Sequence, residues 1–152
     1  LFPYTTLFRS EMEKQRLKYA EQPCMGIERI AEVARALDTP VMADESAWNA
    51  HDAIQIAEQH AIEIVSIYTT KPGGLYRAME VAAVCRAAGI VCNVNGSIET
   101  GVGNLANVHL AAAAPAALWP PLWWHHASQW WRADVRQATA RAAVPGPREV
   151  PR

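Results

Sequence analysis

The sequence predicts an α/β fold in which strand–helix units surround a parallel sheet. Three observations predict it. Short apolar runs alternate with longer stretches of helical period between residues 17 and 115, the repeat is about 24 residues long, and each apolar run ends on a polar side chain. Strands and helices that alternate at this pitch form βα units, in which right-handed crossovers leave the strands parallel in one sheet.

The first half of this region contains two such units. We expect a short strand at 17–21 (LKYAE) and a helix at 27–37 (IERIAEVARAL), where apolar residues recur with helical period. The next strand is expected at 40–44 (PVMAD), with Pro40 at its start, where a missing N–H is tolerated. A second helix is expected at 49–60 (NAHDAIQIAEQH). The apolar face of the first helix comprises Ile27, Ile30, Ala31, Ala34 and Leu37.

The second half repeats the pattern. A strand is expected at 63–68 (EIVSIY), because β-branched residues dominate it. The helix expected at 73–89 ends on Gly89, which suits a left-handed cap at the C-terminus. A fourth strand is expected at 90–95 (IVCNVN), and residues 100–115 hold a helix that the final proline helps to stop.

Polar side chains lie where each predicted strand ends, and this edge of a parallel sheet is the usual place for chemistry. These strand-end residues are Glu21, Asp44, Tyr68, Asn93 and Asn95. Side chains alternate between the two faces along a strand. If the strand ends face inward, Tyr19, Met42 and Ser66 face inward with them.

Two carboxylates, Glu21 and Asp44, would then lie on adjacent parallel strands. Their backbones would be roughly 5 Å apart. Like charges at this spacing repel, and one of the pair would be driven to its protonated form. A hard divalent cation such as Mg²⁺ relieves the repulsion, because it prefers oxygen ligands. The alternative is that each acid caps the helix that follows it.

The composition is globular and argues against several classes of protein. The chain has 152 residues, of which 51% are hydrophobic and 19% are charged, enough for one domain with a core. The net charge of −1 and the scattered Lys and Arg residues provide no basic field, so we expect neither a nucleic-acid partner nor membrane binding. Three cysteines without C-x-x-C spacing favour buried thiols and a cytoplasmic location; they are Cys24, Cys85 and Cys92.

The two ends differ from the regular middle. Residues 1–10 (LFPYTTLFRS) match, residue for residue, the translation of a common sequencing-library adapter, so we interpret them as a scar. Residues 118–152 are rich in Trp, Pro and Arg and have no sustained period. A frameshift near residue 118 is the favoured interpretation; a Trp-rich binding tail is the alternative. The domain is therefore expected to span residues 11–117.

The motifs YAEQP, ADES, KPGGL, AAGI and IETGVGNLANVHLAAA, in this order and spacing, resemble the C-terminal barrel of the enolase superfamily. The subgroup of muconate lactonizing enzyme, related to mandelate racemase, is the most similar. The resemblance implies the C-terminal half (βα units 4 to 7) of a TIM-like (β/α)7β barrel, with a separate N-terminal capping domain. It also implies a homo-oligomeric parent enzyme that uses Mg²⁺, or Mn²⁺, to remove the proton α to the carboxylate of a small substrate, giving a metal-stabilised enediolate.

The resemblance also assigns roles to individual residues. Glu21 and Asp44 match the metal ligands that end the fourth and fifth strands of the barrel. Glu45 matches a neighbouring acid that tunes basic groups nearby. Glu99 lies in the loop motif after the seventh strand, where it is a candidate catalytic or substrate-contacting group. Asn95 is a candidate substrate ligand at the end of the same strand.

The sequence departs from the family pattern in ways that bear on the chemistry. The third metal ligand, the K-x-K motif and the capping domain would lie upstream of residue 11. Tyr68, a candidate catalytic residue, stands where the subgroup has a lysine. Lys71 is expected to bind the substrate carboxylate or serve the loop. Because a phenol is a poor base at neutral pH, a one-base dehydratase or cycloisomerase is favoured over a racemase. Tyr68 could instead pack against the substrate or donate a hydrogen bond to it.

Two alternatives remain open at this point. Lys71 could form a Schiff base in an aldolase-like barrel. The chain could also be a non-catalytic truncated product whose unpaired edge strands make it associate. We expect an enzyme by ancestry that is inactive as this fragment.

Overall fold

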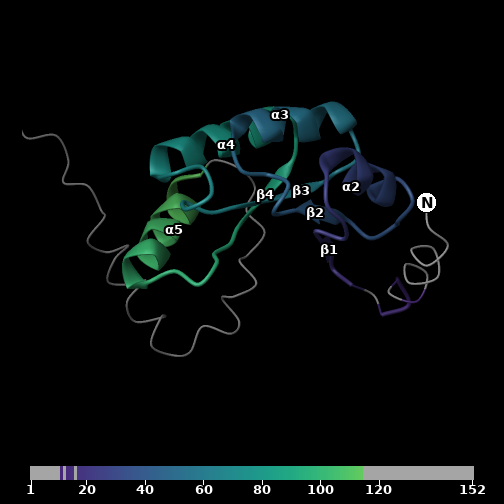
Figure 1. The fold of residues 1–152 in the computed structure, drawn as a ribbon, viewed down its shortest axis with the longest axis horizontal. Coiled ribbons are helices and arrows are strands. Elements are labelled where there is room, and N and C mark those ends of the chain that lie inside the picture. Colours follow the sequence, from purple (N-terminus) through teal and green to yellow (C-terminus); the bar gives the residue numbers. More distant parts are fainter. Residues whose placement is uncertain (1–10, 12, 16, 115–152) are drawn as a thin grey trace, which may run out of the picture. The chain divides into compact units, whose positions relative to one another are not determined.

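The computed structural model describes residues 11, 13–15 and 17–114. The predicted scar at 1–10 and the irregular tail at 118–152 lie outside these residues. Strands and helices alternate along the chain (Figure 1), which confirms the predicted α/β class. The elements are β1 (Ala20–Glu21), α2 (Ile27–Ala34), β2 (Val41–Ala43), α3 (Ala50–Gln59), β3 (Ile64–Ile67), α4 (Leu75–Ala87), β4 (Val91–Val94) and α5 (Gly101–Ala113).

The four strands form one parallel sheet in the order β1-β2-β3-β4. Each strand therefore pairs with its neighbour in the sequence, and a helix connects each pair. Pairing at β1 covers only two residues: the Ala20 amide donates to the Pro40 carbonyl at 2.8 Å, and the Gln22 amide donates to the Met42 carbonyl at 2.8 Å. This strand is shorter than the predicted 17–21, because only Ala20 and Glu21 pair with β2.

The sheet has one face covered by helices and one concave inner face. Strand residues on the covered face join helix residues in a single apolar cluster, and α2, α3 and α4 lie along this side of the sheet (Figure 1). The strand residues of the cluster are Val41, Ala43, Val65, Ile67, Cys92 and Val94. They alternate with Met42, Ser66 and Asn93, which are also buried but face the other way. The predicted alternation is therefore present.

Side chains from strands that are not neighbours meet across the inner face. The Asn93 amide of β4 lies 3.8 Å from the Met42 sulfur of β2. The Asn95 amide, just after β4, donates to Glu21 Oε1 on β1 at 3.4 Å, although β1 and β4 are the two outer strands. A flat sheet would hold these side chains well apart, since each strand adds about 4.8 Å. The sheet is therefore strongly curved, as a segment of a barrel is.

Each helix lies within its predicted range, but α2 ends at Ala34, three residues before the predicted end at residue 37. In α2, the predicted apolar face is buried or packed against the cluster. Asn49 caps α3, with its side chain accepting from the His51 and Asp52 amides, while Asp52 accepts from the Asn49 amide in return. This reciprocal arrangement is a capping box, which satisfies amides that the first helical turn leaves without partners.

Helix α4 ends in a Schellman motif at Gly89. The Ile90 amide donates to the Cys85 carbonyl at 2.8 Å, and the Gly89 amide donates to the Arg86 carbonyl at 3.2 Å. Gly89 has a φ of 73°, which confirms the predicted left-handed cap. The same helix end turns the chain into β4, so this glycine sets where the fourth strand starts.

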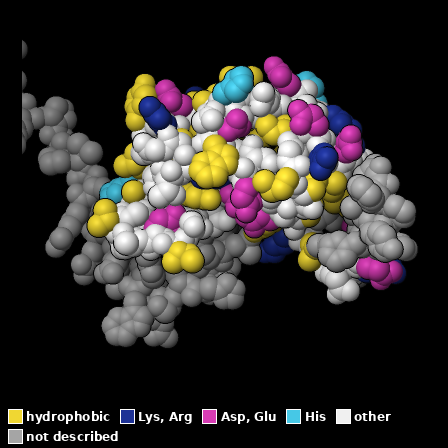
Figure 2. Space-filling model, viewed as in Figure 1, with side chains coloured by type: hydrophobic (Ala, Val, Ile, Leu, Met, Phe, Trp, Pro, Cys, Tyr) yellow, Lys and Arg dark blue, Asp and Glu magenta, His cyan; other side chains and the backbone are white. Residues whose placement is uncertain are grey.

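The surface shown in Figure 2 carries single Lys and Arg side chains that stand apart from one another and are mixed with acidic ones. In the described part of the chain, no helix has both the length and the apolar character needed to span a bilayer. Among these residues Cys85 and Cys92 are buried free thiols, and Cys24 is a partly buried one.

We expect Gly89→Ala to lower the unfolding free energy by about 1 kcal/mol, because an L-residue is strained at this φ. A Cβ at Gly89 would meet no atom within 4 Å, so the loss would come from the backbone alone. The matched control is Gly101→Ala at the start of α5, where a Cβ also has open space and φ is not positive. The control should keep or raise the stability measured by urea denaturation. Equal losses from both substitutions would contradict the role of the cap.

Candidate active site

Glu21 and Asp44 come together at the edge of the sheet where the strands end. Glu21 is the last residue of β1, and Asp44 directly follows β2, its paired neighbour. Partial burial raises the pKa of Glu21, and so do the charge of Asp44 and a hydrogen bond between the two side chains. The two acids therefore interact directly, and Glu21 holds a proton more tightly than an isolated carboxylate would.

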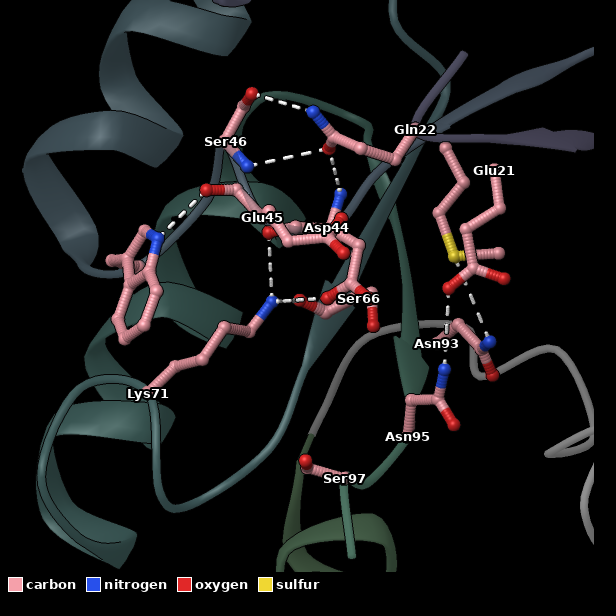
Figure 3. Close-up of polar contacts among 12 residues, drawn as sticks. Glu21, Gln22, Asp44, Glu45, Ser46, Ser66, Lys71, Asn93, Asn95 and Ser97 are labelled. Atoms are coloured by element: carbon pink, nitrogen blue, oxygen red, sulfur yellow. Dashed lines mark hydrogen bonds and ion pairs between the residues drawn. The ribbon is translucent and has the colours of Figure 1, made fainter. Parts of the chain in front are cut away.

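Gln22 fixes the spacing between these two strand ends. Its side-chain carbonyl accepts from the Asp44 amide at 2.8 Å and from the Ser46 amide at 3.3 Å. Its side-chain nitrogen donates to Ser46 Oγ at 2.8 Å (Figure 3). The same nitrogen donates to the Cys24 carbonyl, also at 2.8 Å. Gln22 itself has a φ of 39°, a left-handed conformation that is strained for a non-glycine residue. One amide thus joins the loop after β1 to the loop after β2.

Lys71 supplies a positive charge beside the acids. It lies in the turn after β3, and its ammonium forms a 2.7 Å ion pair with Asp44 Oδ1. The same nitrogen donates to the Asp44 carbonyl at 3.0 Å and to the Ser66 carbonyl at 2.6 Å (Figure 3). Only 2% of the Lys71 side chain is exposed. Three acceptors match the three donors of an ammonium, so a substrate contact would replace one of these bonds.

Tyr68 lies one residue beyond β3, with the Lys71 ammonium 4.4 Å from the centre of its ring. The pKa of Tyr68 is raised to about 12. Burial is the largest cause, and the nearby negative charges add to it; they belong to Asp44, Glu45, Glu99 and Glu21. Burial lowers the pKa of Lys71, whereas its hydrogen bond to Asp44 and the surrounding acids oppose that change. The phenol is therefore protonated at neutral pH and can donate a hydrogen bond.

The other predicted residues lie around this centre. Asn95 contacts Glu21, as described above. Glu45 is exposed, and its charge is one of those that raise the pKa of Glu21. Glu99 lies in the loop between β4 and α5, where Oε1 accepts from the Ser97 amide at 2.8 Å and from Thr70 Oγ1 at 3.3 Å. The assigned roles of these residues stay predictions.

Sequence reasoning assigned no role to three residues that shape this edge: Gln22, Ser46 and Asn107. The motifs that contain them were visible, as EQP, ADES and NLANVH. Nothing in the motif letters shows that Gln22 and Ser46 bond each other across 24 residues, or that Asn107 reaches back 38 residues to Thr69. Such contacts depend on the tertiary fold.

The donors present fit part of a divalent cation site. Two carboxylates held at adjacent strand ends, one of them with a raised pKa, are suitable oxygen ligands for Mg²⁺. The described residues contain no group of three or more His, Cys, Asp or Glu side chains that could hold a metal. Glu21 and Asp44 would therefore need water or ligands from elsewhere to complete the coordination.

A curved parallel sheet whose strands are connected by helices defines a segment of an α/β barrel. Residues 6–145 match the family described as enolase C-terminal domain-like, and the chain belongs to this family. The family prediction made from the motifs is thereby confirmed.

Individual relatives agree with this assignment. Muconate cycloisomerase 1 from Rhodococcus opacus is 44% identical over 97 residues, which are 62% of this chain and 26% of that protein. The o-succinylbenzoate synthase of Thermobifida fusca is 36% identical over 104 residues, which are 68% of this chain and 32% of that protein.

Solved structures show the same fold. A dipeptide epimerase from Enterococcus faecalis V583, complexed with Mg and the dipeptide L-Leu-L-Tyr, superposes with a TM-score of 0.69 at 29% identity, covering 74% of this chain and 32% of that one. A muconate cycloisomerase from Azorhizobium caulinodans gives a TM-score of 0.68 at 31% identity, covering 75% of this chain and 32% of that one. The chain thus spans about a third or less of the length of these relatives, and the fold is the C-terminal portion of their barrel.

We expect Gln22→Ala to lower the unfolding free energy by about 2 kcal/mol, because it removes the bonds to the loop after β2 and keeps the strained φ. Gln22→Gly loses the same bonds but relieves the strain, so its loss should be smaller by about 1 kcal/mol. Gln55→Ala, at an exposed position of α3, is the control and should stay within about 0.5 kcal/mol of the parent in urea denaturation. An alanine variant no less stable than the glycine variant would contradict the strain at Gln22.

The raised pKa of Tyr68 predicts a specific pH dependence. Between about pH 10 and pH 12 the folded chain keeps a proton that the unfolded chain has lost, so stability falls as the pH rises through this window. Ultraviolet titration of phenolate absorbance should show a late component near pH 12 that Tyr68→Phe removes. Tyr76→Phe, at an exposed tyrosine, should leave that component in place. A late component that survives Tyr68→Phe would contradict the assignment.

Proposed function

We propose that this chain provides part of the active site of a Mg²⁺-dependent lyase or isomerase that removes the proton α to the carboxylate of a small substrate. Mn²⁺ is a second candidate ion. The observation that carries the proposal is that Glu21 and Asp44 lie together at the ends of two paired strands, where burial and then the charge of Asp44 raise the pKa of Glu21. Two carboxylates held together at the edge of a parallel sheet repel each other, and a hard cation bound between them would relieve that repulsion.

The relatives support the same reaction class. They include a muconate cycloisomerase, an o-succinylbenzoate synthase and a structure of an epimerase with Mg and a dipeptide. Muconate, succinylbenzoate and dipeptides all carry carboxylates. A small carboxylate is therefore the substrate class that we propose for the enzyme to which this chain corresponds.

Each residue of the site has a proposed task. Glu21 and Asp44 would hold the cation, which, when bound, would offset negative charge that develops on the substrate carboxylate. Lys71 holds Asp44 in place through its side chain and its backbone carbonyl. Asn95 orients the Glu21 carboxylate. Tyr68 would donate a hydrogen bond to the substrate.

The protonation state of Tyr68 favours a dehydratase or cycloisomerase over a racemase. A racemase needs an acid or base on each face of the substrate carbon. With its pKa raised to about 12, Tyr68 cannot serve as the base on its face at neutral pH. A Schiff base at Lys71 is not favoured, because its ammonium is buried in an ion pair and the relatives carry out other chemistry.

We also propose that the 152-residue chain alone binds the cation weakly and does not turn over substrate. The described residues provide two carboxylates of a metal site and lack a third group near them. Tyr68, which stands where the family has a lysine, holds its proton at neutral pH and so cannot act as the base.

Calorimetric titration of the full chain with Mg²⁺ tests the metal proposal. Glu21→Gln should weaken binding at least about tenfold, because it removes a charged ligand without disturbing the Lys71 ion pair. Asp44→Asn should weaken it at least as much. Glu58→Gln, at an exposed acid of α3, should change the affinity less than about twofold. Equal affinities for the Glu21 and Glu58 variants, or no binding by the parent chain, would refute the proposal.

A further inference from the structure

Asn107 is a buried amide on α5, outside the set of acids and bases described above. It is only 2% exposed, and its Oδ1 accepts two hydrogen bonds from one residue. The Thr69 amide donates at 2.8 Å, and the Thr69 hydroxyl donates at 2.9 Å. Thr69 lies two residues beyond the end of β3, where strand pairing has stopped. The Asn107 side chain of α5 therefore accepts the hydrogen bond that a neighbouring strand would otherwise accept from the Thr69 amide.

Thr69 also opens the turn that carries Lys71. Its carbonyl accepts from the Gly74 amide at 2.7 Å, which closes the turn over residues 69–74. Gly73 and Gly74 have φ values of 88° and 126°. The end of the turn therefore needs a backbone conformation that glycine adopts more readily than other residues. The first residue of the turn is held by Asn107 and the last by Thr69. The position of Lys71 between them follows from these two anchors.

A second contact joins the same turn to the loop before α5. Thr70 Oγ1 donates to Glu99 Oε1 at 3.3 Å. Within the described part of the chain, Glu99 Oε2 and Asn107 Nδ2 are buried without a hydrogen-bond partner. Both atoms border Gly96: a Cβ there would lie 2.8 Å from Glu99 Oε2 and 3.3 Å from Asn107 Nδ2. Asn107 thus faces the Lys71 turn with its oxygen and the Glu99 loop with its nitrogen.

We propose that Asn107 is a positioning residue of the candidate site: it holds the turn over residues 69–74 against α5 and thereby keeps the Lys71 ammonium buried against Asp44. The importance of Asp44 for chemistry rests on the proposed function. The placement of Lys71 does not, and it can be measured without metal, substrate or turnover.

The competing explanation is that Asn107 only stabilises the fold, as other buried residues of α5 do. Leu110 is the matched case. It lies on the same helix, is fully buried, and packs in the apolar cluster. A general loss of stability would affect variants at both positions, whereas release of the turn should follow from changes at Asn107 alone.

The burial of Lys71 can be measured by chemical modification, because the chain has few lysines to compare. The chain has three lysines, and Lys18 is exposed, whereas the Lys71 side chain is 2% exposed. Brief acetylation with acetic anhydride in EDTA, read by peptide mass spectrometry, gives the rate at Lys71 relative to Lys18 within each molecule. Two lost hydrogen bonds should raise this ratio at least about tenfold in Asn107→Ala. Leu110→Ala, measured where both variants are folded, should stay within about twofold of the parent.

Two further variants sharpen the result. Asn107→Asp keeps the acceptor for both Thr69 donors but turns a second oxygen toward Glu99, so Lys71 should be better protected than in Asn107→Ala and less well than in the parent. Thr69→Val removes the hydroxyl bond and keeps the amide bond, so it should give a smaller rise than Asn107→Ala. This variant decides the matter if Asn107→Ala does not fold.

An unchanged ratio in Asn107→Ala, or an equal rise in Leu110→Ala, would overturn the proposal. If Asn107→Ala cannot be measured, an unchanged ratio in Thr69→Val would overturn it. Failure of Mg²⁺ binding in calorimetry would count against the proposed function and leave this measurement unaffected.

Discussion

The parallel pairing of four successive strands is the constraint on which the rest of this structure depends. Parallel strands that are neighbours in sequence must all end at the same edge, and every crossover helix returns along the same face. The edge therefore collects whatever follows each strand, and here that includes two acids, Glu21 and Asp44. Their mutual repulsion is a consequence of the topology. Lys71, from the turn after the next strand, offsets it with a charge that is itself buried.

The loops at this edge are held by side chains that reach from one to the next. Gln22 joins the first loop to the second, Lys71 joins the third to the second, and Asn107 joins the third to the helix after the fourth. Each of these bonds satisfies a backbone or charged group that strand pairing has ceased to satisfy. The geometry of the site is thus set by contacts between loops, and the sheet supplies only their starting points.

This division explains what could be predicted from the sequence. Helix and strand positions follow from apolar periodicity, and the placement of Glu21 and Asp44 follows from parallel topology, so both were accessible. The left-handed Gly89 was predictable because its requirement is local. The burial of the Lys71 ammonium was not predictable, because its partner Asp44 follows β2 and its partner Ser66 lies in β3. The roles of Gln22 and Asn107 were hidden for the same reason: an amide in a motif does not reveal a partner 22 or 38 residues away.

The contact between Glu21 and Asn95 has a consequence for the order in which the molecule folds. It spans 74 residues, whereas paired positions of neighbouring strands are 21 to 27 residues apart. Loop-closure entropy rises with the length of chain enclosed, so adjacent strands can associate before this contact forms. The two acids would then meet while the amide from the fourth strand is still absent. A partly folded state of this kind would hold both acids without the group that orients one of the two carboxylates.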